Sequence, residues 1–225
     1  MTIGIISAMQ KEQQQLVSLL ESPRTEERGP FAYTVGQLNG NSLVLQQCGI
    51  GKVNAAVGAA ELINHYHPST LISTGVAGGI DQSLDIMDVV VGQQVVYHDV
   101  TIPGCELGQV QGLPALFDGD ASLVASARSL DDARIHVGLI CSGDQFISDR
   151  DQLATIKNHF PEGLAVDMES GALAQVCYLY KVPFLSFRII SDTPGSDGHV
   201  AQYFDFWERM AAQSFDITRR FLLTL

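Results

Sequence analysis

The stretch Thr2–Ser7 (TIGIIS) is the first of several short apolar segments, and it leads directly into Ala8-Met9-Gln10-Lys11-Glu12. Its apolar side chains fall on both faces of an extended chain, which is typical of a strand that helices cover on both sides. Asn39-Gly40 between two later segments marks a hairpin, so the sheet is expected to be mixed. The other expected strands are residues 31–38, 41–48, 70–74, 89–96, 135–142, 164–166 and 184–190.

Amphipathic helices are expected between these strands. Residues 52–66 and 169–180 carry apolar side chains spaced by three and four positions, which is the spacing of one helix face. Residues 200–223 are predicted to form one last helix, with an aromatic stripe that packs on the core. Its stripe consists of Tyr203, Trp207, Met210, Ile217 and Phe221. This alternation predicts an α/β fold with three layers, α/β/α, around a central mixed sheet, in a single domain of residues 1–225.

The composition excludes several classes of protein. The chain has 225 residues with 13 Lys and Arg against 25 Asp and Glu, a net charge of −12. A charge of this sign disfavours nucleic acid and anionic membrane surfaces. No apolar run approaches the roughly 20 residues of a membrane span, and the start of the chain lacks the basic region of a signal peptide. The four cysteines form no CxxC pair, so neither a metal site nor a disulfide framework is expected. We therefore expect a cytoplasmic protein.

Residues 100–119 differ from the rest of the chain. They include three glycines before Leu113-Pro114 and show little periodicity. A structureless stretch of about 20 residues inside a compact domain is often a binding loop or an interface. We therefore expect this loop at a binding site or between subunits.

Glycine and acidic clusters follow several of the predicted strands. In open α/β sheets, ligands bind beyond the carboxyl ends of the strands. The clusters are Ala8-Met9-Gln10-Lys11-Glu12, Gly49-Ile50-Gly51-Lys52, Gly75-Val76-Ala77-Gly78-Gly79, Val166-Asp167-Met168-Glu169 and Arg188-Ile189-Ile190-Ser191-Asp192. None completes a dinucleotide-binding fingerprint or a P-loop, which argues against an NAD-binding Rossmann protein.

Taken together and in this order, the clusters resemble the 5′-methylthioadenosine/S-adenosylhomocysteine nucleosidases of the purine nucleoside phosphorylase superfamily. The resemblance runs from residue 3 to about residue 221. The stretches that carry it are residues 3–9 with Glu12, residues 49–53, residues 142–147 (SGDQFI), Met168-Glu169, and Arg188 with Ser191-Asp192. It implies a nucleoside phosphorylase-like fold, no cofactor, no metal, a homodimer with the 100–119 loop at its interface, and a small nucleoside as substrate.

The reaction implied by the resemblance is hydrolysis of the N-glycosidic bond, which releases adenine and the 5′-thioribose. Such a reaction needs an acid for the leaving purine and a base for the attacking water. By resemblance, Asp192 is the acid and Glu12 the base. An ordinary Asp has a pKa of about 3.9, so acting near neutrality requires a rise of roughly 3 units. From the residues alone, Asp192 could equally cap a turn, and Glu12 could be a solvated acid in the first turn of a helix.

The resemblance also assigns substrate contacts. Glu169 is expected to bind the ribose hydroxyls, with Met168 against the sugar. Phe146 is expected to stack on adenine and the Ile147 backbone to read the base edge. Arg188 is expected to hold a carboxylate or sugar oxygen, a structural ion pair being the alternative. The helix N-terminus and the core are the corresponding alternatives for Glu169 and Phe146. The remaining expected contacts are Ile50, Gly75, Val76, Val166 and Ser191.

The sequence departs from the family pattern in three places. Val76 stands where relatives have a Ser that reaches the ribose, so that contact is lost or passes to a backbone group. Asp167 replaces the usual Glu. The 100–114 loop is shortened and lacks the aromatic residues that line the 5′-substituent pocket in relatives. These changes leave open the ranking among methylthioadenosine, adenosylhomocysteine and 5′-deoxyadenosine.

Other functions in the same superfamily remain as alternatives. A purine nucleoside phosphorylase needs arginines for phosphate, and the first two glycine loops contain none; Lys52 is the one cation close to such a site. Nucleosidases that act on futalosine-type nucleosides or on adenosine monophosphate belong to the same superfamily, and the pattern does not separate them, although no second domain or basic phosphate patch supports the monophosphate enzyme. A nucleoside-binding module would need neither Glu12 nor Asp192, so the presence of both acids favours a hydrolase.

Overall fold

Strand β1 (Thr2–Ser7) lies inside the sheet because it pairs in parallel with both β4 (Asn41–Gln47) and β5 (Thr70–Gly79). The computed structural model describes residues 1–194, 196, 198–209 and 211–225. Its ten-stranded sheet has the order β10-β6-β8-β9-β5-β1-β4-β3-β2, with β7 beside β6. The other strands are β2 (Glu21–Arg28), β3 (Phe31–Leu38), β6 (Val89–Tyr97), β7 (Leu116–Asp118), β8 (Ile135–Ser142), β9 (Gly163–Asp167) and β10 (Phe184–Asp192).

The sheet curls back on itself at one end. Strand β10 pairs in parallel with β5 and antiparallel with β6. Because β5 also pairs with β9, and β8 joins β9 to β6, these five strands form a closed circuit. The circuit brings the carboxyl ends of β5, β9 and β10 together.

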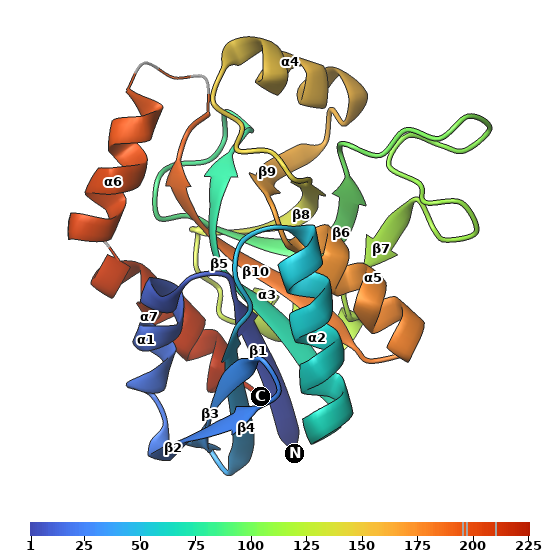
Figure 1. The fold of residues 1–225 in the computed structure, drawn as a ribbon. Coiled ribbons are helices and arrows are strands. Elements are labelled where there is room, and N and C mark those ends of the chain that lie inside the picture. The colour runs from blue at the N-terminus through green and yellow to red at the C-terminus, as the bar shows by residue number, and fades with distance from the viewer. Residues whose placement is uncertain (195, 197, 210) are drawn as a thin grey trace.

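Helices cover both faces of the sheet (Figure 1). Helices α2 (Lys52–Tyr66) and α5 (Ser170–Tyr180) pack side by side on one face. Helices α1 (Gln10–Val17), α3 (Ala121–Arg128), α6 (His199–Arg209) and α7 (Ala211–Leu222) contribute to the apolar core of the other face. Helix α4 (Arg150–His159) packs through Ile156 on a smaller third cluster. The α/β/α layers and the mixed sheet confirm the predicted fold.

Alternation along the strands divides the core between the two faces. On β1, Ile6 packs toward α2 and α5, whereas Ile3 and Ile5 join the cluster that includes Phe221 of α7. Gly4 lets α2 approach, since a Cβ there would lie 2.7 Å from Leu62 Cδ2. The sheet is therefore buried on both faces, as expected from its apolar strands.

Several element boundaries differ from the prediction. Strands β5 and β10 run on to Gly79 and Asp192, past the expected ends at 74 and 190. Strand β7 lies inside residues 100–119, which were expected to be loop throughout. The single helix expected at 200–223 is two helices, α6 and α7, and Met210 lies outside the described residues.

Besides β7, strand β2 and helices α3 and α4 were not predicted, each for a local reason. Strand β2 (ESPRTEER) is polar and mostly exposed because it forms the edge of the sheet beside β3. Helices α3 and α4 are short, and each begins at an aspartate whose side chain accepts hydrogen bonds from backbone N–H groups: Asp120 from Leu123 at 3.1 Å and Asp149 from Gln152 at 2.8 Å. Such caps compensate for a weak apolar pattern.

Among the described residues, no helix is both long and apolar enough to cross a membrane.

Candidate active site

A cavity opens where β1, β5, β9 and β10 end. This is where ligands bind in open α/β sheets. Of the twelve predicted site residues, ten line the cavity; they are Glu12, Ile50, Val76, Phe146, Ile147, Val166, Met168, Glu169, Ser191 and Asp192. Gly75 and Arg188 are not on its wall.

Glu12 is buried in the first turn of α1, with 1% of its surface exposed. Its carboxylate accepts hydrogen bonds from the Met9 N–H at 2.9 Å and from the Val76 N–H at 3.0 Å. Burial raises the pKa of Glu12, and the Arg188 charge together with these hydrogen bonds opposes that rise. Glu12 is therefore buried at the cavity wall, which a solvated first-turn acid would not be, and the Val76 backbone N–H serves to hold it there.

Asp192 ends β10 and is 4% exposed. Its carboxyl accepts a hydrogen bond from the Ser191 hydroxyl at 2.7 Å. Burial raises the pKa of Asp192, while the Ser191 hydrogen bond and the charge of His199 lower it. A carboxyl group with a raised pKa can keep its proton at a pH where an ordinary Asp has lost it.

Arg188 lies behind the cavity wall, where 1% of it is exposed. Its Nε is 2.8 Å from Asp167 Oδ2, its Nη2 donates to Ser73 Oγ at 2.7 Å, and Nη2 is 4.0 Å from Glu169 Oε2. The structure thus places Arg188 in a buried ion pair and not on the wall of the cavity. The predicted contact with a carboxylate is present, but the carboxylate belongs to the protein.

Gly75 gives these charged groups the space they occupy. A Cβ at this position would lie 2.5 Å from Glu12 Oε1 and 2.7 Å from Arg188 Nη1. Both distances are shorter than non-bonded atoms tolerate, so any side chain at position 75 would displace Glu12 or Arg188. The glycine therefore shapes the site without lining it.

Glu169 immediately precedes α5 and is 6% exposed. Its Oε1 accepts a hydrogen bond from the Gly51 N–H at 2.9 Å. Burial raises the pKa of Glu169, and the Arg188 charge opposes the rise.

Phe146 is 50% exposed. Its ring stacks on His199 with the ring centres 6.3 Å apart and meets Tyr203 edge-on with the centres 5.9 Å apart. Phe146 is thus a rim residue available to a planar ligand and not a core phenylalanine.

Sequence reasoning missed several lining residues. Met9 belongs to a quoted cluster, so its place after β1 could have marked it as a candidate. Tyr203 was assigned to core packing, yet it lines the cavity and donates to Met9 Sδ at 3.5 Å. No local signal indicates that approach, because it depends on where α6 packs. The other missed lining residues are Ala8, Ala77, Gly78, Gln145, Asp167 and Pro194.

Replacing Arg188 should destabilise the fold far more than replacing a surface arginine. Arg188→Met leaves Asp167 buried and unpaired, so we expect a loss of about 3–5 kcal/mol in the free energy of unfolding. The control is Arg134→Met, which breaks a partly exposed pair with Asp132 (2.8 Å) and should cost less than about 1 kcal/mol. Urea unfolding followed by circular dichroism measures both. Equal losses in the free energy of unfolding would mean that the buried pair contributes no more to stability than the partly exposed pair.

Comparison with known proteins places the chain in a family. The model of the phosphorylase superfamily matches residues 2–223. The 5′-methylthioadenosine/S-adenosylhomocysteine nucleosidase of Maridesulfovibrio salexigens is 42% identical over 220 residues, covering 95% of this chain and 95% of that protein. The protein of the same name from Lysinibacillus sphaericus is 39% identical over 219 residues, covering 95% and 94%.

Solved structures agree with these relatives. The nucleosidase of Streptococcus pneumoniae with the transition-state inhibitor MT-ImmA has a TM-score of 0.94 at 33% identity, covering 100% of this chain and 99% of that one. The nucleosidase of Colwellia psychrerythraea in complex with adenine has a TM-score of 0.94 at 35% identity, covering 100% and 96%. With the cavity and its buried carboxyl groups, these matches show that the chain belongs to the 5′-methylthioadenosine/S-adenosylhomocysteine nucleosidase family of the phosphorylase superfamily.

Proposed function

We propose that this protein hydrolyses the N-glycosidic bond of 5′-methylthioadenosine and S-adenosylhomocysteine, releasing adenine and the 5′-thioribose. The relatives named above support the substrate. The observation that carries the chemistry is the presence of two buried carboxyl groups with raised pKa, Glu12 and Asp192, on one cavity wall. The ten-stranded sheet, built from strands along most of the chain, supports residues 1–225 as a single catalytic domain.

Asp192 serves as the general acid in this proposal. Cleavage of the C1′–N9 bond leaves negative charge on the purine, and a proton from Asp192 to N7 neutralises it. The Ser191 hydroxyl at 2.7 Å fixes the carboxyl for this transfer. Burial raises the pKa of Asp192, which favours the protonated form that this role requires.

Glu12 serves as the general base. It takes a proton from the water that attacks C1′, and a raised pKa makes it a stronger base than an ordinary glutamate. Its two backbone donors, the N–H groups of Met9 and Val76, hold the carboxylate in place for that water. Glu169 then binds the ribose hydroxyls and Phe146 stacks on adenine. In each turnover Glu12 gains one proton and Asp192 loses one. Proton exchange with solvent then restores both groups.

The site favours water over phosphate as the second substrate. Among the described lining residues there is no arginine or lysine. Arg188 is paired with Asp167 behind the wall, and the Lys52 ammonium lies 2.8 Å from Asp99 Oδ2. Phosphate would also face the Glu12 carboxylate. A phosphorylase is therefore disfavoured.

The direct test is adenine release from 5′-methylthioadenosine with and without phosphate. We expect phosphate to change nothing. Asp192→Asn and Glu12→Gln should each lower kcat by about 10²–10⁴-fold, the usual contribution of a general acid or base. The matched controls Asp205→Asn and Glu27→Gln remove exposed acids and should behave as wild type. Phosphate-dependent turnover would refute hydrolysis, and near-normal activity of either site variant would refute that residue's role.

A homodimer is part of the proposal, with α2, α5 and the 100–115 loop at the interface. Apolar side chains gather on these elements: Val53 is 74% and Leu179 56% exposed. In Figure 1, α2 and α5 lie together and the loop before β7 projects from the body on the same side. Three buried cysteines, Cys48, Cys141 and Cys177, fit the reducing cytoplasm proposed as its location.

Sedimentation velocity tests the dimer. Wild type should sediment at about twice the 24.3 kDa chain mass. Val53→Glu should shift it toward the monomer, because a charge would be buried in the interface. The control Phe204→Glu alters a similarly exposed residue (62%) on α6 and should stay dimeric. A monomeric wild type would refute this arrangement.

A further inference from the structure

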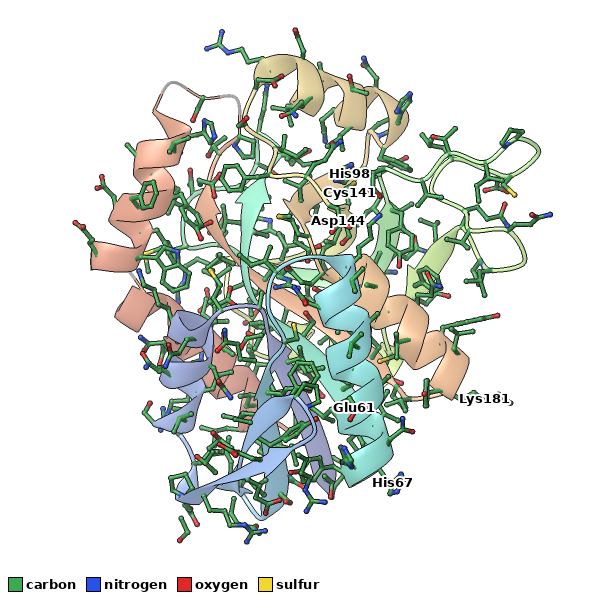
Figure 2. The ribbon with its side chains drawn as sticks, in the orientation of Figure 1. Glu61, His67, His98, Cys141, Asp144 and Lys181 are labelled. Carbon is green, nitrogen blue, oxygen red and sulfur yellow. The ribbon has the colours of Figure 1, made fainter. Side chains whose placement is uncertain are left out.

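Three residues at the start of α2 form a closed ring of hydrogen bonds outside the cavity. The Lys52 backbone N–H donates to Asp144 Oδ1 at 2.8 Å, and the Asp144 backbone N–H donates to Asp99 Oδ2 at 2.9 Å. The Lys52 ammonium closes the ring on both Asp99 oxygens, at 2.8 and 3.0 Å. Figure 2 shows Asp144 next to the first turn of α2, below His98 and Cys141. The ring therefore ties together the ends of β6 and β8 and the start of α2.

The Lys52–Asp99 pair of the ring is partly buried. The side chains of Lys52 and Asp99 are 25% and 16% exposed, and the ammonium also lies 5.1 Å from the centre of the Tyr97 ring. Burial alone would raise the pKa of Asp99, but the hydrogen bonds from Lys52 and Asp144 hold it below its usual value. Gly51 has φ +95°, a conformation that favours glycine, and a Cβ there would lie 3.0 Å from Asp144 Oδ1, so Asp144 would have to shift by a few tenths of an ångström.

Two residues next to the ring in the sequence, Phe146 and Gly51, connect it to the site. Asp144 is two residues before Phe146, the half-exposed ring at the cavity rim. Gly51, the residue before Lys52, donates its N–H to Glu169 at 2.9 Å. The successive N–H groups of Gly51 and Lys52, at the start of α2, thus bind the carboxylates of Glu169 and Asp144. In the proposed function, Glu169 belongs to the ribose side of the site and Asp144 to the purine side. None of the three ring residues lines the cavity.

We propose that Lys52, Asp99 and Asp144 are positioning residues that fix the purine-contacting loop around Phe146 against the start of α2. Lys52 acts through Asp99 and Asp144 and does not touch the substrate. This inference rests on the proposed function, in which Phe146 carries the adenine. It also gives a role to the lysine that sequence analysis left as a possible phosphate ligand.

The test separates substrate positioning from chemistry and from stability. Lys52→Met and Asp99→Asn are measured for KM and kcat with 5′-methylthioadenosine, and for the Kd of adenine by calorimetric titration. Since Glu12 and Asp192 are untouched, we expect kcat to stay within about threefold and both KM and Kd to rise about tenfold, the effect of losing one charge-assisted hydrogen bond. Lys52→Arg should restore most of the affinity because a guanidinium can also pair with a carboxylate.

Lys157→Met is the matched control. It also breaks a lysine–aspartate pair, with Asp81 at 3.0 Å and exposures of 27% and 30%, away from the cavity. It should leave KM and the adenine Kd unchanged. Equal effects of Lys157→Met and Lys52→Met would overturn the proposal, as would an unchanged KM and Kd in Lys52→Met. Absence of adenine release by wild type would refute the proposed function instead, and the adenine titration would still decide the role of the ring.

Discussion

The buried ion pair between the Arg188 guanidinium and Asp167 is the interaction on which the rest of the site depends. A cation that is 1% exposed can persist only if carboxylates and hydroxyls satisfy it. Asp167 pairs with it at 2.8 Å, Ser73 accepts at 2.7 Å, and the charges of Glu169 and Glu12 help to raise its pKa against the effect of burial. In return, the charge of Arg188 opposes the rise that burial causes in the pKa of Glu12 and of Glu169. Gly75 follows from this arrangement, since only a residue without a side chain leaves space for it.

The same charge distribution separates the two carboxyl groups that face the substrate. Glu12 lies in the field of Arg188, which favours its ionised form. Asp192 lies at the end of β10 with Ser191 as its hydrogen-bond partner, and Arg188 is not among the groups that shift its pKa. Environments that differ in this way support the proposal that Glu12 acts as the base and Asp192 as the acid. The cavity also offers no cationic side chain to a phosphate, which fits hydrolysis.

Much of the fold and of the cavity was predictable because apolar strands and the residues after them are local features. The eight expected strands all occur, and ten of twelve expected site residues line the cavity. The failures have physical causes. Strand β2 is polar because it forms a sheet edge, so hydropathy could not find it. Tyr203 and the Lys52–Asp99–Asp144 ring depend on how distant elements pack.

The measurement that tests the central claim most directly is the pH dependence of kcat/KM for 5′-methylthioadenosine. In the proposed mechanism, turnover requires Glu12 ionised and Asp192 protonated. Because burial raises both pKa values above 4.5 and 3.8, activity should fall at low pH as Glu12 gains a proton. At high pH it should fall as Asp192 loses one, and both limbs should lie above those ordinary values. A profile that falls as the pH rises through about 4, as for an ordinary aspartic acid, would contradict the account. So would a profile that pH does not change.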